Sequence, residues 1–119
     1  MRYGYARVST RKQLAGNSME DQIRLLTQQR CDEIITEQYT GATTNRPKFE
    51  KLIQELKTDD MLVVTKLDRF ARNVTEGIKI IRYLFSQRVK VYVLNVGLLE
   101  NTAMGNFFLT TLLAVAELE

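Results

Sequence analysis

The chain has 119 residues, of which 45% are hydrophobic and 26% are charged, so it suits one compact domain that folds without disulfides or metals. It contains one cysteine, Cys31, and no histidine. This excludes a disulfide framework, a zinc cluster and any nucleophile activated by a histidine base. The net charge of +3 permits a polyanionic partner without requiring one. No apolar run is long enough to span a bilayer and no secretory segment is present, so we expect a cytoplasmic protein.

The first half of the chain contains two predicted strands, each followed by a polar loop and a helix. The strands cover residues 2–8 and 33–39, and the loops cover residues 9–17 and 40–46. Ser18 and Asp21 form a capping box at the start of the first helix, and Pro47 is well placed to begin the second. The apolar stripe of the second helix consists of Phe49, Leu52, Ile53 and Leu56.

The second half continues the alternation of strands and helices. Residues 61–66 form an apolar run typical of a strand covered on both faces. Asn73 caps a third helix, residues 89–96 form a fourth strand, and residues 107–119 form a last helix after the connection 97–106. This order predicts the α/β class: an open three-layer domain with a mostly parallel sheet of four or five strands, flanked by helices and ending in a long helix.

The last predicted helix is apolar around more than one face. Its apolar residues are Phe107, Phe108, Leu109, Leu112, Leu113, Val115, Ala116 and Leu118. One stripe can pack on the rest of the domain, but the remainder needs another partner. Two interpretations stay open: a helix buried wholly within one copy of the chain, or a helix through which copies associate. No capping residue precedes the end at Glu119, so we expect the natural helix to continue further.

Cationic side chains follow the ends of the predicted strands. Ser9 ends the first strand, and the segment KLDRFAR, residues 66–72, follows the third. Because ligands bind outside the carboxyl ends of parallel strands, we expect both segments on one rim of the sheet. The arginines of this region are Arg7, Arg46, Arg69 and Arg72. Any one of them could be an ordinary surface charge, but four arginines around a serine predict a site for phosphate oxygens.

A serine among arginines favours phosphoryl transfer. Its oxygen can form a covalent intermediate that divides one displacement into two steps, and arginines can stabilise the charge of the transition state. No P-loop occurs, and the adjacent acids Asp59 and Asp60 precede a strand, where a turn explains them better than a metal site. We therefore expect chemistry that is driven by arginine and free of metal. The group that deprotonates Ser9 stays open between Asp68 and a neighbouring arginine.

The segments YARVSTRKQ and KLDRFAR resemble the catalytic domain of the serine site-specific recombinases, the resolvase and invertase family. The segments GATTNRPKFEKL and AMGNFFLTTLLAVAELE resemble two further blocks of that family in the same order, so the resemblance covers residues 1–119. It implies that Ser9 attacks a DNA phosphodiester and forms a 5′-phosphoserine link. Strand exchange within a tetramer and religation then follow, without ATP, metal or another cofactor.

The resemblance also implies residue roles and partners. It makes Ser9 the nucleophile, Arg7, Arg46, Arg69 and Arg72 the phosphate-binding and activating arginines, Asp68 the supporting acid, and Tyr5, Gln13 and Gln22 residues that help to shape the site. Packing alone would explain Tyr5. The implied partners are double-stranded DNA and further copies of the chain, in a homodimer or homotetramer through the C-terminal helix, with no membrane. The family's separate DNA-binding region is absent from this chain, so we expect the chain alone to lack sequence-specific DNA affinity.

Two other functions stay open at this point. The first is a catalytically silent, recombinase-like module kept for oligomerisation or regulation, against which the intact Ser9 and its four arginines argue. The second is a generic α/β domain that binds a small phosphorylated ligand. That function explains the arginines but leaves the broadly apolar last helix unexplained.

Overall fold

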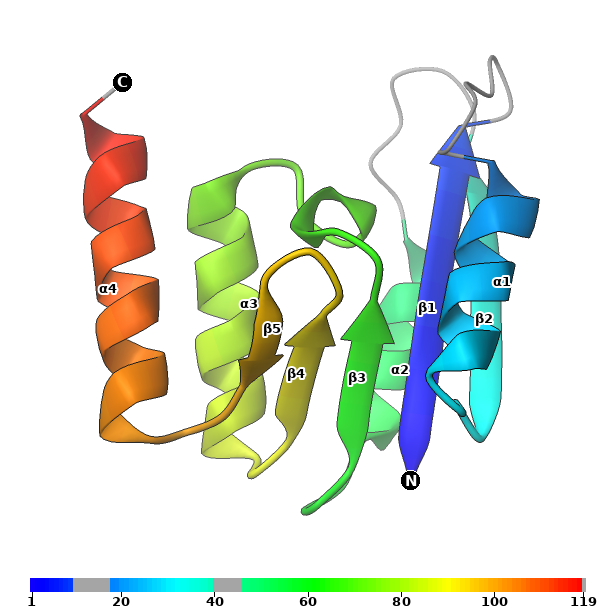
Figure 1. The fold of residues 1–119 in the computed structure, drawn as a ribbon, viewed down its shortest axis with the longest axis horizontal. Coiled ribbons are helices and arrows are strands. Elements are labelled where there is room, and N and C mark those ends of the chain that lie inside the picture. The colour runs from blue at the N-terminus through cyan, green and yellow to red at the C-terminus, as the bar shows by residue number, and fades with distance from the viewer. Residues whose placement is uncertain (10–17, 40–45, 119) are drawn as a thin grey trace.

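The computed structural model contains one five-stranded sheet with helices on both faces (Figure 1). It describes residues 1–9, 18–39 and 46–118, and of Ser9 and Tyr39 the backbone only. The strands are β1 (Arg2–Ser9), β2 (Glu33–Tyr39), β3 (Met61–Val64), β4 (Lys90–Val93) and β5 (Gly97–Leu99). The helices are α1 (Met19–Gln28), α2 (Pro47–Glu55), α3 (Val74–Ser86) and α4 (Ala103–Glu117), with a single 3-10 turn, η1 (Leu67–Arg69), after β3. The predicted α/β class is confirmed.

The strand order β2-β1-β3-β4-β5 places β1 inside the sheet. The first four strands are parallel, and β5 is antiparallel to β4. β1 pairs with β2 from Tyr3 to Ser9, but with β3 only from Arg2 to Gly4, so the end of β1 extends beyond β3. The carboxyl ends of the parallel strands share one edge of the sheet with η1 and the start of α2 (Figure 1). We call this edge the upper rim.

Hydrophobic burial explains the three layers. On one face of the sheet, Leu26 of α1 packs with Ala6 and Val63. On the other face, α2 and α3 cover the main core, whose largest fully buried side chains include Tyr5 and Phe49. Helix α4 adds Leu109, which is fully buried, and lies beside α3 in Figure 1. Successive side chains of a strand point to opposite faces of the sheet, so the strands supply apolar side chains to both faces. The predicted three-layer architecture requires this.

The exposed side of α4 settles one of the open questions about this helix. Met104, Phe107 and Leu118 are 74%, 67% and 86% exposed. The interpretation of a helix buried wholly within one copy of the chain is therefore wrong. Apolar side chains this exposed on one helix are typical of a contact surface. In the described part of the chain, no helix has the length and apolar character that crossing a membrane requires.

The predicted third strand ends two residues early, at Val64, and two other predicted boundaries differ more from the structure. The predicted strand over residues 89–96 pairs only from Lys90 to Val93, because the backbone turns there: the Val96 N–H donates to the Val93 carbonyl. Gly97 follows with φ +133°, a conformation that favours glycine, and the chain returns as β5. The last helix begins at Ala103 instead of residue 107, because the Thr102 side chain caps it by accepting from the Gly105 N–H.

Gly105 lets the start of α4 pack against the preceding turn. A Cβ atom at this position would lie 2.1 Å from the Glu100 carbonyl oxygen, so the backbone would have to move. We expect Gly105→Ala to lower the free energy of unfolding by about 1–3 kcal/mol, measured by urea denaturation. Thr111→Ala, at an exposed position of the same helix, is the control and is expected to change it by at most about 0.5 kcal/mol. Equal stability of the two variants would contradict the close approach.

Candidate active site

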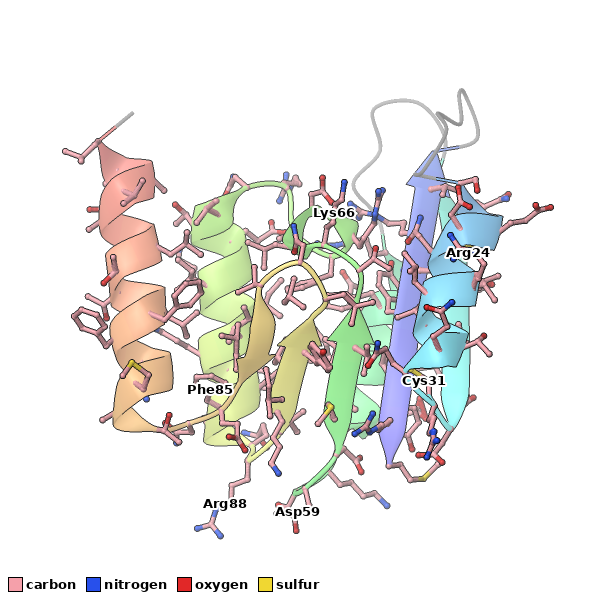
Figure 2. The ribbon with its side chains drawn as sticks, in the orientation of Figure 1. Arg24, Cys31, Asp59, Lys66, Phe85 and Arg88 are labelled. Atoms are coloured by element: carbon pink, nitrogen blue, oxygen red, sulfur yellow. The ribbon has the colours of Figure 1, made fainter. Side chains whose placement is uncertain are left out.

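The upper rim collects the predicted arginines from three separate segments. Arg7 lies on β1, Arg46 directly precedes α2, and Arg69 and Arg72 lie in and after η1. Lys66, between β3 and η1, marks the same edge in Figure 2, whereas Asp59 and Arg88 lie at the opposite edge. Asp60 accepts hydrogen bonds there from the amino terminus and from the Lys57 N–H, as expected for a turn.

Arg7 links β1 to η1 across the space beyond the end of β3. Its Nη2 donates to the Asp68 carbonyl oxygen at 3.2 Å. Its backbone is held by Gln22 of α1: the Arg7 N–H donates to Oε1 at 3.1 Å, and Nε2 donates to the Arg7 carbonyl at 3.0 Å. Gln22 is 1% exposed, so this side-chain amide supplies the donor and acceptor that a neighbouring strand would otherwise provide. Gln22 therefore orders the strand end that carries Arg7.

The Arg46 side chain is 12% exposed, less than those of Arg69 and Arg72 at 15% and 59%. Its Nη1 donates to the Phe70 carbonyl and to Glu76 Oε1, the latter at 2.8 Å. Its guanidinium carbon lies 5.5 Å from the centre of the Phe49 ring, within the range of a cation–π contact. These contacts fix the guanidinium between the start of α2 and the segment after η1.

Arg72 shares the Glu76 carboxylate with Arg46. Its Nε donates to Glu76 Oε2 at 3.1 Å, and its backbone N–H donates to Oε1 at 3.2 Å. Partial burial raises the pKa of the Glu76 carboxyl. The hydrogen bonds from Arg72 and Arg46, together with the Arg46 charge, outweigh that effect and hold the pKa below its ordinary value. Glu76 is therefore ionised at neutral pH and holds two arginines at once.

Arg69 and Asp68 are neighbours in η1 with different environments. The Arg69 side chain is 15% exposed, whereas the Asp68 side chain is 71% exposed. Arg69 Nε lies 3.8 Å from Asp68 Oδ1, an ion pair too long for a hydrogen bond. A cavity of about 270 Å³ beside η1 is lined in part by Asp68, Arg72 and Lys66. This part of the rim thus offers both a hollow and positive charge.

Tyr5 is buried below the rim and holds an acidic partner. Its hydroxyl donates to Glu37 Oε1 at 2.6 Å, and the Tyr5 side chain is fully buried. Glu37 also accepts from the backbone N–H groups of Lys48 and Phe49, so it closes the amino-terminal turn of α2. Burial and the hydrogen bond to Glu37 raise the pKa of Tyr5, which keeps the phenol protonated. Tyr5 thereby helps to place the start of α2, and with it Arg46.

Ser9 is the last residue of β1 and is in register with Tyr39 of β2. It therefore lies at the upper rim, two residues beyond Arg7, although its hydroxyl is outside the described part of the structure. Gln13 also lies outside the described residues. Nothing in the structure bears on the position of its side chain.

Two acids of the site were not predicted, Glu37 and Glu76. In the sequence, Glu37 can be explained as a polar residue of an alternating strand, and Glu76 as an acid in the first turn of a helix. Each also has a partner 30 or more positions away, Tyr5 for Glu37 and Arg46 for Glu76. The only available signal for Glu37 was an acid on a strand that packs under a helix. Among the described residues, no group of three acidic or cysteine side chains is arranged to hold a metal ion.

Comparison with known proteins identifies the family of this chain. Residues 2–119 match the family model of the resolvase N-terminal domain. The chain is 34% identical to the transposon Tn917 resolvase of Enterococcus faecalis, over 100% of this chain and 62% of that protein. It is also 34% identical to the DNA-invertase hin of Salmonella typhimurium, over 98% of this chain and 59% of that protein. The chain thus spans about three fifths of the length of these two curated relatives.

The fold agrees with this assignment. The structure is similar to the N-terminal catalytic domain of the TP901-1 integrase, with a TM-score of 0.74 and 31% sequence identity, over 98% of this chain and 94% of that chain. A resolvase family site-specific recombinase from Streptococcus pneumoniae is similar with a TM-score of 0.66 and 25% identity, over 98% of this chain and 85% of that chain. With its rim of arginines and this sheet order, the chain belongs to the family of resolvase N-terminal domains.

Proposed function

We propose that this chain is the catalytic domain of a site-specific recombinase that cuts and rejoins double-stranded DNA through Ser9. The observation that carries the proposal is the connected set of arginines at the upper rim: Arg7 bonds to the backbone of η1, and Arg46 and Arg72 share Glu76. The resolvases and the DNA-invertase to which the chain is similar fit a DNA substrate.

In the proposed reaction, the Ser9 oxygen attacks a backbone phosphorus of DNA. A serine–phosphorus bond forms, the bond to the 3′-oxygen breaks, and that oxygen leaves with a proton as a free 3′-hydroxyl. Ser9 lies two residues beyond Arg7 on β1, at the rim to which the four arginines belong. Arg7, Arg46, Arg69 and Arg72 then stabilise the charge on the phosphate oxygens, and Asp68 orients Arg69.

The proposed reaction needs no ATP or metal. The phosphodiester bond that breaks is replaced by a phosphoserine ester, which keeps its free energy for religation to a new 3′-hydroxyl. The arginines supply the positive charge that a metal ion supplies in other phosphoryl-transfer sites. Gln22 and Tyr5 act at a distance, by holding the end of β1 and the start of α2, and we extend the same supporting role to Gln13.

Strand exchange requires more than one copy of the chain. We propose that copies associate through α4, whose exposed apolar side chains include Met104, Phe107 and Leu118. The resulting homodimer or homotetramer would hold two DNA sites together. The same surface also supports the second candidate function, a catalytically silent module for oligomerisation.

A covalent protein–DNA adduct would distinguish these two functions. The full-length protein is incubated in EDTA, without nucleotide, with a pool of supercoiled plasmids that carry fragments of the source genome. We expect an adduct on a denaturing gel, in which mass spectrometry locates the DNA 5′-phosphate on the peptide that contains Ser9. Attachment at another residue would contradict the mechanism, and absence of any adduct across the pool would favour the silent module.

A further inference from the structure

We propose that Glu76 is a positioning residue that sets the separation and direction of Arg46 and Arg72 for phosphoryl transfer. This inference rests on the proposed function. No sequence motif singles out Glu76, which is the third residue of α3 and whose backbone N–H bonds to the Asn73 side chain.

The geometry makes Glu76 the contact that joins the two arginines. Its Oε1 accepts from Arg46 Nη1 at 2.8 Å, and its Oε2 accepts from Arg72 Nε at 3.1 Å. Arg46 comes from the segment before α2 and Arg72 from the segment after η1, so these contacts cross between separate parts of the chain. Each carboxylate oxygen faces one guanidinium, which fixes both cations relative to α3.

Two cations that contact the same carboxylate repel one another, and the enclosure of Arg46 strengthens the repulsion. Arg46 and Glu76 are only 12% and 21% exposed, so water screens them poorly. The charge of Glu76 compensates the repulsion, and its lowered pKa shows that the carboxylate form is favoured there. Its place in the first turn of α3 adds favourable interaction with the helix dipole.

Glu76 engages only part of each guanidinium. It binds Arg72 through Nε, and among the contacts of the described residues none engages the terminal nitrogens of Arg72. The Arg72 side chain is 59% exposed, so these nitrogens can reach an incoming phosphate. A carboxylate behind two guanidinium groups would thus direct them outward, in the way that supporting acids orient functional side chains.

The test measures cleavage and DNA binding separately in the full-length protein, on a plasmid found to form the covalent adduct. We expect Glu76→Gln to lower the single-turnover cleavage rate at saturating DNA by about 10–100-fold. DNA affinity should stay equal or become tighter, because one negative charge is lost. Glu76→Asp, which keeps the charge on a shorter side chain, should recover part of the rate. The matched control is Glu100→Gln, which removes an exposed acid paired with Lys90 and should cleave like the wild type.

Arg72→Lys tests whether Glu76 acts through its arginine partners. In the Arg72→Lys variant, Glu76→Gln should lower the cleavage rate several-fold less than it does in the wild type, because the contact between Glu76 and the Arg72 guanidinium is already lost. Urea denaturation identifies any variant that fails to fold, and Glu76→Asp then carries the test. A wild-type rate in Glu76→Gln, faster cleavage, or a parallel loss of binding and rate would each overturn the inference. Failure of the wild type itself to form an adduct would instead reject the proposed function.

Discussion

Replacing Ser9 by alanine is expected to abolish the covalent protein–DNA adduct and to lower strand cleavage by at least about 10⁴-fold. In the proposed reaction, the substitution removes the oxygen that bonds to phosphorus, so the arginines would bind a DNA substrate that no nucleophile attacks. DNA affinity should be unchanged, because the phosphate contacts come from guanidinium groups. The measurement is a denaturing gel of the full-length protein with its plasmid substrate, combined with a separate binding assay.

Ser18→Ala is the matched control for the Ser9 substitution. Ser18 caps α1 by accepting from the Asp21 N–H at 3.1 Å, so its loss should lower stability by about 1 kcal/mol. Adduct formation by this variant should nevertheless remain at the wild-type level under native conditions. An adduct of wild-type abundance in Ser9→Ala would show that another residue is the nucleophile.

Arg46→Lys is expected to slow cleavage by about 10²–10³-fold, the second largest effect. A lysine keeps the positive charge, but its single ammonium cannot reproduce the planar contacts of the guanidinium with Phe70, Glu76 and the Phe49 ring. Single-turnover cleavage at saturating DNA measures the effect on the chemical step. Binding should weaken much less, since charge attraction to the DNA backbone is retained.

Arg24→Lys is the corresponding control. Arg24 lies on α1 with a side chain that is 60% exposed, and its ion pair with Asp21 spans 3.7 Å, a contact that contributes little. Its cleavage rate should stay within about twofold of the wild type, as expected for a surface substitution. Equal rates for Arg46→Lys and Arg24→Lys would remove Arg46 from the site.

Local physical chemistry made most of the fold predictable. The apolar run that contains Met61–Val64 is typical of a strand covered on both faces. Ser18 and Asn73 predict helix starts because their side chains can cap the first turn. The division of residues 89–99 into β4 and β5 was not predicted, because Asn95 and Gly97 are the only turn residues in this segment and the apolar residues around them continue the strand pattern. The conformation of Gly97 marks that turn only once the backbone is known.

Some residues of the candidate site could be predicted from the sequence and others could not. The common position of Arg7, Arg46, Arg69 and Arg72 at the upper rim could be predicted because parallel strands end at one edge of the sheet. Glu37, which holds Tyr5 and the start of α2, and Glu76, which pairs with Arg46, could not be predicted, because packing brings these groups together from distant parts of the chain. A glutamate in the first turn of a helix is locally satisfied, and nothing along the chain indicates that its carboxylate also reaches Arg46.

The short β3 leaves the last residues of β1 with a paired neighbour on one side only, where Gln22 substitutes for a missing ladder at Arg7. A strand end that is paired with β2 alone, and held on its other side by one side-chain amide, can open at lower cost than the doubly paired base of the sheet. Within β1, the amide hydrogens that face away from β2 near this end should therefore exchange for deuterium before those at the base. In the proposed function, such an opening would let the end of β1 move while the base of the sheet stays paired.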